Sequence, residues 1–210
     1  MRATLNPNNS GMNIRLEDIR DNTTLEKRPL AMNWIEKPIV VAERLMGLLR
    51  LYNLFFAFIA LVPSHPFTDY FQGLEENEAV KQIFGDRTGE ILSGLKIHFI
   101  RVAGYMGVNP LNGHLVVNPA YLVNGDELDI YLDLVHELVH VRQQMDGKPL
   151  FEGGYGYVER PTEIEAYRHT VEEARRMGLS SERICSYLKT EWMSVDDLRK
   201  LARTLGVECS

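Results

Sequence analysis

The pentad His136-Glu137-Leu138-Val139-His140 constrains this chain more than any other feature of its sequence. Residues four positions apart lie on one face of a helix, so His136 and His140 can direct their imidazoles at a single ion. Glu137 then lies beside the same ion as a candidate proton acceptor, which is the arrangement that an H-E-x-x-H sequence produces on a helix. The spacing therefore predicts a metal site built on a helix.

The flanking sequence favours a helix at this position. Apolar side chains recur at steps of three and four residues from Leu128 to Val139, and polar side chains take the opposite face. The turn residues Asn124-Gly125-Asp126 precede the segment and Gly147 follows it. We predict a mostly buried helix over residues 126–146. A surface helix with two unligated histidines is the alternative, but a buried neutral histidine needs a partner, and a metal supplies one.

A catalytic zinc site usually has three protein ligands, so a third donor is expected. A second helix is predicted to begin at Pro161, where Thr162 and Glu165 have the S/T-x-x-E spacing of a capping box. That spacing gives Glu165 a structural role and leaves Glu163 as the freer carboxylate. Ala166 is small enough to let the two helices approach closely. The resulting order of candidates for the third ligand is Glu163, Glu165, Glu159 and His169, each of which could instead be an ordinary solvated side chain.

The sequence Leu-Val-His-Glu-Leu-Val-His-Val-Arg-Gln-Gln at 134–144, with Pro-Thr-Glu-Ile-Glu-Ala at 161–166, resembles zincin metallopeptidases whose second helix offers an E-x-x-A glutamate. It is similar to compact gluzincin-like domains of the ImmA/IrrE type. The resemblance covers residues 93–178 and lacks the third histidine and Met-turn of metzincins and the N-E-x-x-S-D helix of thermolysin-like enzymes. It implies a Zn2+ site with His136, His140 and Glu163 as ligands and Glu137 as general base.

A fold and a reaction follow from these features. The expected fold class is α+β, with a zincin-like core that holds a small sheet and the active-site helix, plus flanking N- and C-terminal helices. The expected activity is zinc-dependent hydrolysis of peptide bonds in a peptide or protein substrate, with Glu137 accepting the proton of the attacking water. Tyr155 and Tyr157 are candidate oxyanion donors. Asp133, one turn before the pentad, is a candidate carboxylate partner for a ligating imidazole.

Two segments before the pentad predict strands, at 95–101 and 114–117. A sheet edge of this kind can pair with an extended peptide, which is the structural argument for a peptide substrate. His98 and His114 lie in these segments. Each is alone there, so a hydrogen-bonded structural role is expected rather than metal ligation.

Net charge, pI and cysteine content indicate which partners the chain can bind and in which cellular compartment it is expected. The net charge of -6 and the sequence pI near 5.6 argue against nucleic-acid binding. Cys185 and Cys209 are the two cysteines, and their separation suggests neither a disulfide framework nor a cysteine metal site. The first thirty residues lack the apolar core of a signal peptide. A cytoplasmic location is therefore expected, and the oligomeric state is left open.

Four regions are predicted along the chain. Residues 1–30 form a flexible segment, 31–92 a helical region, 93–178 the metallopeptidase core and 179–210 a C-terminal helical pair. The apolar stretch within residues 38–62 favours a buried helix, because its uncharged part is shorter than the ~20 residues needed to cross a bilayer. A membrane-surface helix is the alternative. The rival function is accordingly a non-catalytic metal-binding regulatory or membrane-associated interaction protein.

Overall fold

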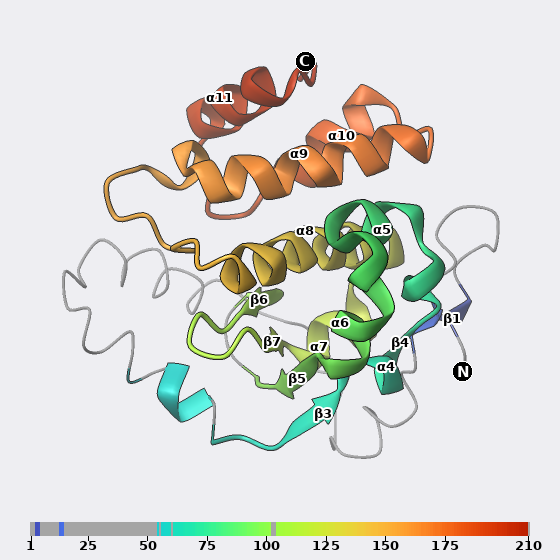
Figure 1. The fold of residues 1–210 in the computed structure, drawn as a ribbon. Helices are drawn as coiled ribbons and strands as arrows, with labels where there is room; N and C mark the ends of the chain where they lie inside the picture. The colour runs from blue at the N-terminus through green and yellow to red at the C-terminus, as the bar shows by residue number, and fades with distance from the viewer. Residues whose placement is uncertain are drawn as a thin grey trace. The chain divides into compact units, whose positions relative to one another are not determined.

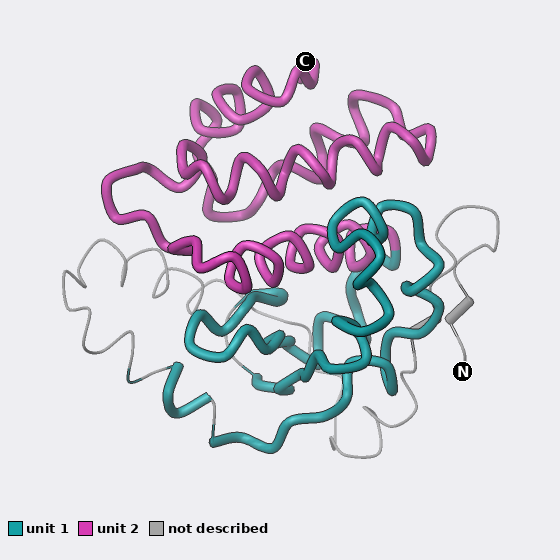
Figure 2. Tube along the Cα trace, in the orientation of Figure 1, with its two compact units in different colours: residues 1–127 teal, residues 128–210 magenta. Residues whose placement is uncertain are grey.

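The computed structural model describes residues 3–4, 13–14, 54, 56–59, 61–101 and 104–209 (Figure 1). The chain divides into two compact units, residues 1–127 and 128–210 (Figure 2). Both helices and strands are present, with a small mixed sheet in the first unit, so the predicted α+β class is confirmed. The predicted boundaries after residues 30, 92 and 178 stay predictions.

The main sheet of the first unit has four strands in the order β3-β5-β7-β6. Strands β5 and β7 pair in parallel, with Ile97 opposite Leu115, and the two outer strands pair antiparallel. The predictions at 95–101 and 114–117 are confirmed as β5 and β7, whereas β3 and β6 were not predicted. The strand bounds are β3 Ser64–Pro66, β5 Lys96–Phe99, β6 Met106–Val108 and β7 Leu115–Val117.

Three two-residue strands form a second sheet in the order β1-β2-β4, with bounds Ala3–Thr4, Asn13–Ile14 and Phe71–Gln72. The rest of the predicted flexible segment 1–30 lies outside the described residues. Most of the apolar stretch 38–62 does too, although residues 54 and 56–59 are helical. Among the described residues, every helix is too short or too polar to cross a bilayer.

Short helices complete the first unit. Helices α4 and α5 lie within residues 31–92, the region that was predicted to be helical, and α6 extends two residues beyond it. The Asn77 side chain accepts a hydrogen bond from the Val80 N–H at 3.2 Å, which caps α5 because the first N–H groups of a helix have no partner within it. The helix bounds are α4 Phe67–Tyr70, α5 Glu78–Phe84, α6 Thr88–Gly94 and α7 Pro119–Asn124.

The described part of the second unit is helical. Its helices are α8 Glu127–Met145, α9 Pro161–Arg176, α10 Ser181–Leu188 and α11 Val195–Leu205, and the 3-10 turn η3 spans Tyr157–Glu159. Both predicted long helices, 126–146 and the one that Pro161 opens, are confirmed. The side chains of Ser180 and Ser194 cap α10 and α11 by accepting from the backbone N–H groups of Arg183 and Asp197. Helix α11 ends at Gly206, whose φ of 63° is a left-handed conformation that glycine adopts at low cost.

Helices α8, α9 and α10 are held together by apolar packing and by buried polar contacts. Tyr131 is fully buried on α8, and its hydroxyl donates to Glu173 on α9 at 2.5 Å. On α10, the Arg183 guanidinium pairs with Asp129 at 2.5 Å, and the Tyr187 hydroxyl donates to Asp133 at 2.9 Å. Both acidic partners lie on α8. These contacts set the position of the helix that carries the pentad.

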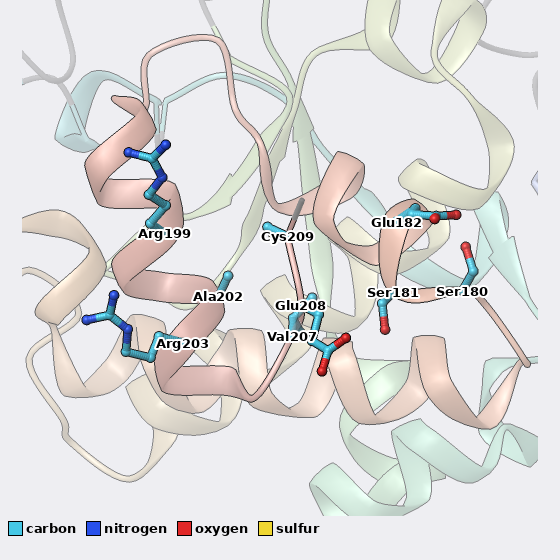
Figure 3. Close-up of a pocket in the computed structure, with 9 residues that line it drawn as sticks. All are labelled: Ser180, Ser181, Glu182, Arg199, Ala202, Arg203, Val207, Glu208 and Cys209. Atoms are coloured by element: carbon cyan, nitrogen blue, oxygen red, sulfur yellow. The ribbon is translucent and has the colours of Figure 1, made fainter.

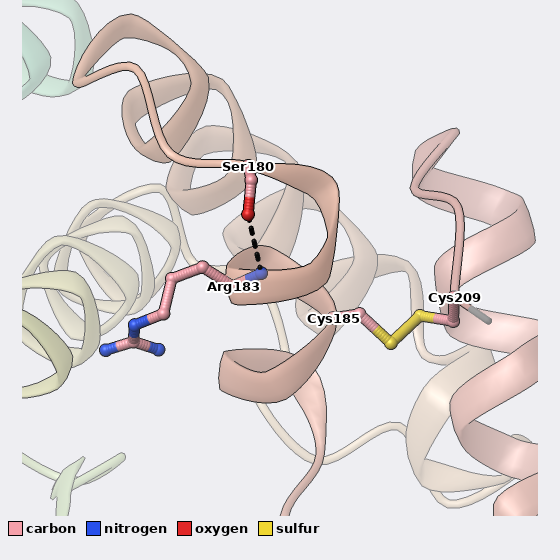
Figure 4. Close-up of a disulfide and its surroundings, with 4 residues drawn as sticks. All are labelled: Ser180, Arg183, Cys185 and Cys209. Atoms are coloured by element: carbon pink, nitrogen blue, oxygen red, sulfur yellow. Dashed lines mark hydrogen bonds between the residues drawn. A yellow bond between two sulfur atoms is a disulfide. The ribbon is translucent and has the colours of Figure 1, made fainter.

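A disulfide joins Cys185 of α10 to Cys209, in the tail that follows α11 (Figure 4). The prediction that the two cysteines form no disulfide is therefore wrong. Their separation of 24 residues in sequence hid the pairing, whereas the turn between α10 and α11 brings their Cα atoms to 5.5 Å, within the usual range for a disulfide. Figure 4 also shows the Ser180 hydroxyl accepting from the Arg183 N–H, at 3.2 Å, at the start of the same helix.

Candidate metal centre

Two helices of the second unit supply the candidate metal-binding side chains. His136 and His140 lie one turn apart on α8, and Glu163 lies in the first turn of α9. Each of the three residues is 6% exposed. A carboxylate is favourable at that position of α9, because the N-terminus of a helix carries a partial positive charge. The three residues that the sequence placed first are thus brought together from two helices.

The spacing of three side-chain atoms is that of a metal ligand set. The Nε2 atoms of His136 and His140 lie 3.0 Å apart. Glu163 Oε2 lies 3.3 Å from the first nitrogen and 3.6 Å from the second. Ligand bonds of 2.0–2.1 Å at tetrahedral angles separate the ligand atoms by about 3.3 Å. The observed triangle therefore fits one tetrahedral ion without rearrangement.

Charge in this cluster also favours a cation. Burial alone would raise the pKa of the Glu163 carboxyl, but the two imidazoles hold that pKa well below its ordinary value. Burial lowers the pKa of His136, whereas for His140 burial is outweighed by the Glu163 carboxylate, which raises its pKa to about 9. A buried carboxylate of this kind needs a positive partner. Either a proton on His140 or a metal ion can supply it.

Glu137 is placed differently from its two neighbours in the pentad. Its carboxylate lies outside the group of donor atoms, and its exposed fraction is 9%. Burial raises the pKa of Glu137 to about 8, and His140 opposes that shift. A carboxyl with a raised pKa exchanges protons near neutral pH, which is the property a general base requires.

The two imidazoles are held in different ways. His140 Nδ1 lies 2.7 Å from the side-chain oxygen of Gln143, which is completely buried. His136 Nδ1 is buried without a hydrogen-bond partner, and the ring packs against Tyr167 with centroids 4.4 Å apart. Sequence reasoning missed Gln143, although a glutamine seven residues after His136 and three after His140 falls on the same helical face. That spacing was the available signal.

Asp133, a candidate partner of the imidazoles that could equally have been an ordinary solvated acid, bonds to α10 instead. Asp133 accepts from the Tyr187 hydroxyl of α10 at 2.9 Å, and neither imidazole has a hydrogen bond to it. Its influence on the site is electrostatic, because its charge contributes to raising the pKa of Glu137. The reason lies in packing: α10 supplies a partner for Asp133 that the sequence of α8 could not indicate.

The predicted capping box is wrong. Arg160 takes the N-cap position of α9 without a side-chain cap. Thr162 donates instead to Glu152, from its hydroxyl at 3.0 Å and from its backbone N–H at 3.3 Å. Glu165 pairs with Arg142, and with Lys148 at 2.9 Å. Glu152 of the preceding loop therefore binds Thr162, and Arg142 of α8 binds Glu165. The capping-box pattern had paired Thr162 and Glu165 with each other.

No protein-family model, no curated protein and no solved structure matches this chain. The resemblance to zincin peptidases therefore rests on the sequence residues quoted above.

The two candidate oxyanion donors, Tyr155 and Tyr157, differ in burial and in their contacts. Tyr155 is 54% exposed, whereas Tyr157 is half-buried and its hydroxyl lies 3.0 Å from that of Tyr167. Burial raises the pKa of Tyr157 well above its ordinary value, and the Glu163 carboxylate adds to the shift. Tyr167 in turn packs on the His136 ring. Tyr157 is thus the candidate that a chain of contacts joins to the cluster.

Glu159 and His169, the remaining candidates for the third ligand, lie outside the donor cluster. Glu159 pairs with Lys200 of α11. His169 is half-buried, and it is not a member of the group formed by His136, His140 and Glu163. These two positions leave Glu163 as the acidic member of the cluster.

His98 of β5 and His114, just before β7, bond to each other, which the sequence did not indicate. His98 Nε2 lies 2.9 Å from His114 Nδ1, and His98 Nδ1 donates to the Val62 carbonyl at 2.9 Å. Their predicted hydrogen-bonded role is confirmed.

A surface pocket in the second unit lies between α10, α11 and the C-terminal tail (Figure 3). Its walls include Ser181, Arg203 and Cys209, and none of the three clustered donors lines it. Arg203 and Arg199 extend from α11 on the side away from Ser181 in this view (Figure 3). The pocket is therefore separate from the candidate metal centre.

Proposed function

We propose that this chain is a zinc-dependent peptidase, with Zn2+ held by His136, His140 and Glu163. The observation that carries the proposal is the triangle of three buried donor atoms, 3.0, 3.3 and 3.6 Å apart. Two imidazoles and one carboxylate leave a fourth tetrahedral position for water or substrate, which is typical of catalytic zinc and not of structural zinc. Membership of the zincin superfamily is part of the same proposal.

In the proposed hydrolysis, the metal ion activates water and substrate, and side chains of the protein transfer the proton and stabilise the developing charge. Zinc supplies Lewis acidity, which polarises a substrate carbonyl and makes water acidic enough to ionise near pH ~7. Glu137 takes the proton of the attacking water and passes it to the leaving amine, so the reaction needs no covalent intermediate. Tyr157 donates a hydrogen bond to the oxygen on which negative charge develops.

Metal analysis is the first test. We expect about one zinc ion per chain in protein purified without added zinc, because one group of three donors is formed among the described residues. Dialysis against a chelator should remove the ion and abolish cleavage of a quenched fluorescent peptide library. Zinc should then restore the activity. A chain that stays metal-free through a zinc titration would contradict the proposed site.

The role of Glu137 needs a variant that keeps the metal. We expect Glu137→Gln to retain zinc and to lose peptide hydrolysis by about 100-fold or more, because general base catalysis contributes on that scale. Glu127→Gln is the matched control, since Glu127 is an exposed carboxylate at the start of the same helix. Unchanged hydrolysis by Glu137→Gln would remove it as the base.

A non-catalytic metal-binding regulatory protein is the second candidate. The observation that favours it is burial, because donors that are each 6% exposed offer a polypeptide little access. Glu137 favours the enzyme, since a purely structural site needs no base. Tight zinc binding together with no cleavage across the peptide library would select the regulatory role.

The partner and the compartment belong to the same proposal. The substrate class is a peptide or protein, and nucleic acid is not proposed as a partner. The predicted cytoplasmic location stays a prediction, and the Cys185–Cys209 disulfide weighs against it because cytosolic thiols are normally kept reduced. Cell fractionation combined with alkylation of free thiols before lysis would decide between a reducing and an oxidising compartment.

A further inference from the structure

The side-chain amide of Gln143 makes three hydrogen-bond contacts, two of them buried and one part-buried. Its oxygen lies 2.7 Å from His140 Nδ1. Its nitrogen donates to the Thr162 carbonyl at 3.0 Å and to the Glu165 carboxylate at 2.8 Å. The side chain is 0% exposed, so water cannot replace any of these partners. Gln143 therefore joins α8, which carries it, to the first turn of α9.

These contacts determine which way the amide faces. A carbonyl oxygen and a carboxylate oxygen can only accept, so both hydrogens of the Gln143 nitrogen are committed to Thr162 and Glu165. The amide oxygen must then face His140, and the imidazole must donate from Nδ1. A neutral His140 consequently carries its proton on Nδ1 and leaves the lone pair of Nε2 directed at Glu163 and His136.

Glu165 holds the amide in place from the other side. Its carboxylate accepts from Gln143 and is itself paired with Lys148 at 2.9 Å and with Arg142. The side chain is 31% exposed, in contrast to the 8% of Glu163. Two neighbouring glutamates on α9 thus have different tasks: Glu163 faces the donor cluster, and Glu165 anchors the amide that orients one member of it.

We infer that Gln143, anchored by Glu165, is a positioning residue that holds His140 in the tautomer and orientation required for metal binding. The inference deepens the proposed function and rests on it. Groups of this kind typically change metal affinity by about 10–100-fold when they are removed. His136 has no such support among the described residues, where its Nδ1 has no hydrogen-bond partner. Gln143 should therefore affect affinity through His140 alone.

The test measures zinc affinity by competition with a chromophoric chelator. Gln143→Met keeps the length of the side chain but replaces the amide oxygen by a thioether, which is only a weak hydrogen-bond acceptor, and it should bind zinc about 10–100-fold more weakly. Gln144→Leu is the matched control, because Gln144 is the half-buried neighbour on the same helix; its affinity should equal that of the unaltered chain.

A second readout separates positioning from a merely structural role. In Co2+-substituted protein, the Nδ1 proton of a ligating histidine gives a paramagnetically shifted, exchangeable NMR signal. We expect the His140 signal to persist in the unaltered chain and in Gln144→Leu, and to exchange rapidly or vanish in Gln143→Met. If Gln143→Met does not fold, Glu165→Ala takes its place, since part-exposed Glu165 tolerates truncation better; the His140 proton should then exchange faster than in the unaltered chain.

The outcomes distinguish the two levels of inference. Zinc affinity and His140 exchange that are unchanged in folded Gln143→Met, or in Glu165→Ala where it replaces that variant, overturn the role of Gln143 and leave the metal site intact. An unaltered chain that binds neither Zn2+ nor Co2+ overturns the proposed function, and this inference with it.

Discussion

Removal of the Cys185–Cys209 disulfide should destabilise the second unit without unfolding it. The two cysteines are separated by 24 residues. The chain-entropy model for closing a loop of that length gives a loss of about 3.4 kcal/mol in the free energy of unfolding at 25 °C. The effect acts through the unfolded chain, which becomes free to separate its two ends. At about 2–4 °C per kcal/mol for a chain of this size, the melting temperature should fall by roughly 7–14 °C.

Contacts around the disulfide explain why the fold should survive its loss. The Arg175 guanidinium donates to the backbone carbonyls of Leu205 at 3.2 Å and Gly206 at 2.6 Å. Val207, in the tail beyond α11, is 7% exposed. These contacts hold the end of α11 and the start of the tail against α9 in the absence of a covalent bond. The far-ultraviolet circular dichroism spectrum at 25 °C should therefore be unchanged.

The assay compares urea unfolding of the oxidised chain, of the chain reduced with a phosphine, and of the Cys185→Ser/Cys209→Ser double variant. The reduced chain and the double variant should unfold at similar, lower urea concentrations. The reductant should have no effect on the double variant, which is the control for reactions other than disulfide cleavage. Equal stability of oxidised and reduced protein would refute the entropy argument, and two titratable thiols under non-reducing conditions would refute the disulfide itself.

Three further outcomes test the site and its support. Glu163→Ala should weaken zinc binding at least about tenfold more than Glu165→Ala, because the first removes a donor and the second removes an anchor; the reverse order would exchange their roles. Tyr157→Phe should lower kcat for peptide hydrolysis by about 100-fold with zinc content unchanged, and an unchanged kcat would exclude it as the oxyanion donor. Tyr131→Phe should reduce the free energy of unfolding by about 1–3 kcal/mol, because a buried carboxylate on α9 loses a hydrogen bond; denaturant titration measures that loss, and a neutral result would mean that the carboxylate finds another donor.

Local patterns in the sequence were sufficient for the second unit's secondary structure. The turn residues before Glu127, the proline at 161 and the serines at 180 and 194 mark where α8, α9, α10 and α11 begin. Each signal works over one helical turn, through hydrogen bonds between residues three or four apart. The relation of His136 to His140 is of the same kind, because helix geometry alone places both imidazoles on one face.

For the strands and for the first turn of α9, local sequence patterns predicted the structure less well. Strands β3 and β6 span three residues each and contain Pro66 and Gly107, residue types that are uncommon in strands, whereas the equally short β7 consists of leucine and valine. The S/T-x-x-E spacing at Thr162 and Glu165 matched a capping box, but side chains from the preceding loop and from α8 compete for the same groups. A local rule fails where a partner from elsewhere in the chain makes the stronger contact.

By itself, the sequence determined that two histidines share a helical face with a glutamate between them, and that a second helix carries neighbouring carboxylates. Tertiary structure decided which carboxylate meets the histidines, since Glu163 and Glu165 differ only in the direction from α9 in which each side chain extends. It also decided that Gln143 supports His140 and that Cys185 meets Cys209. The physical reason is distance along the chain: hydrogen bonds within a helix link near neighbours, whereas Gln143 and Glu165, 22 residues apart, meet only because two helices pack together.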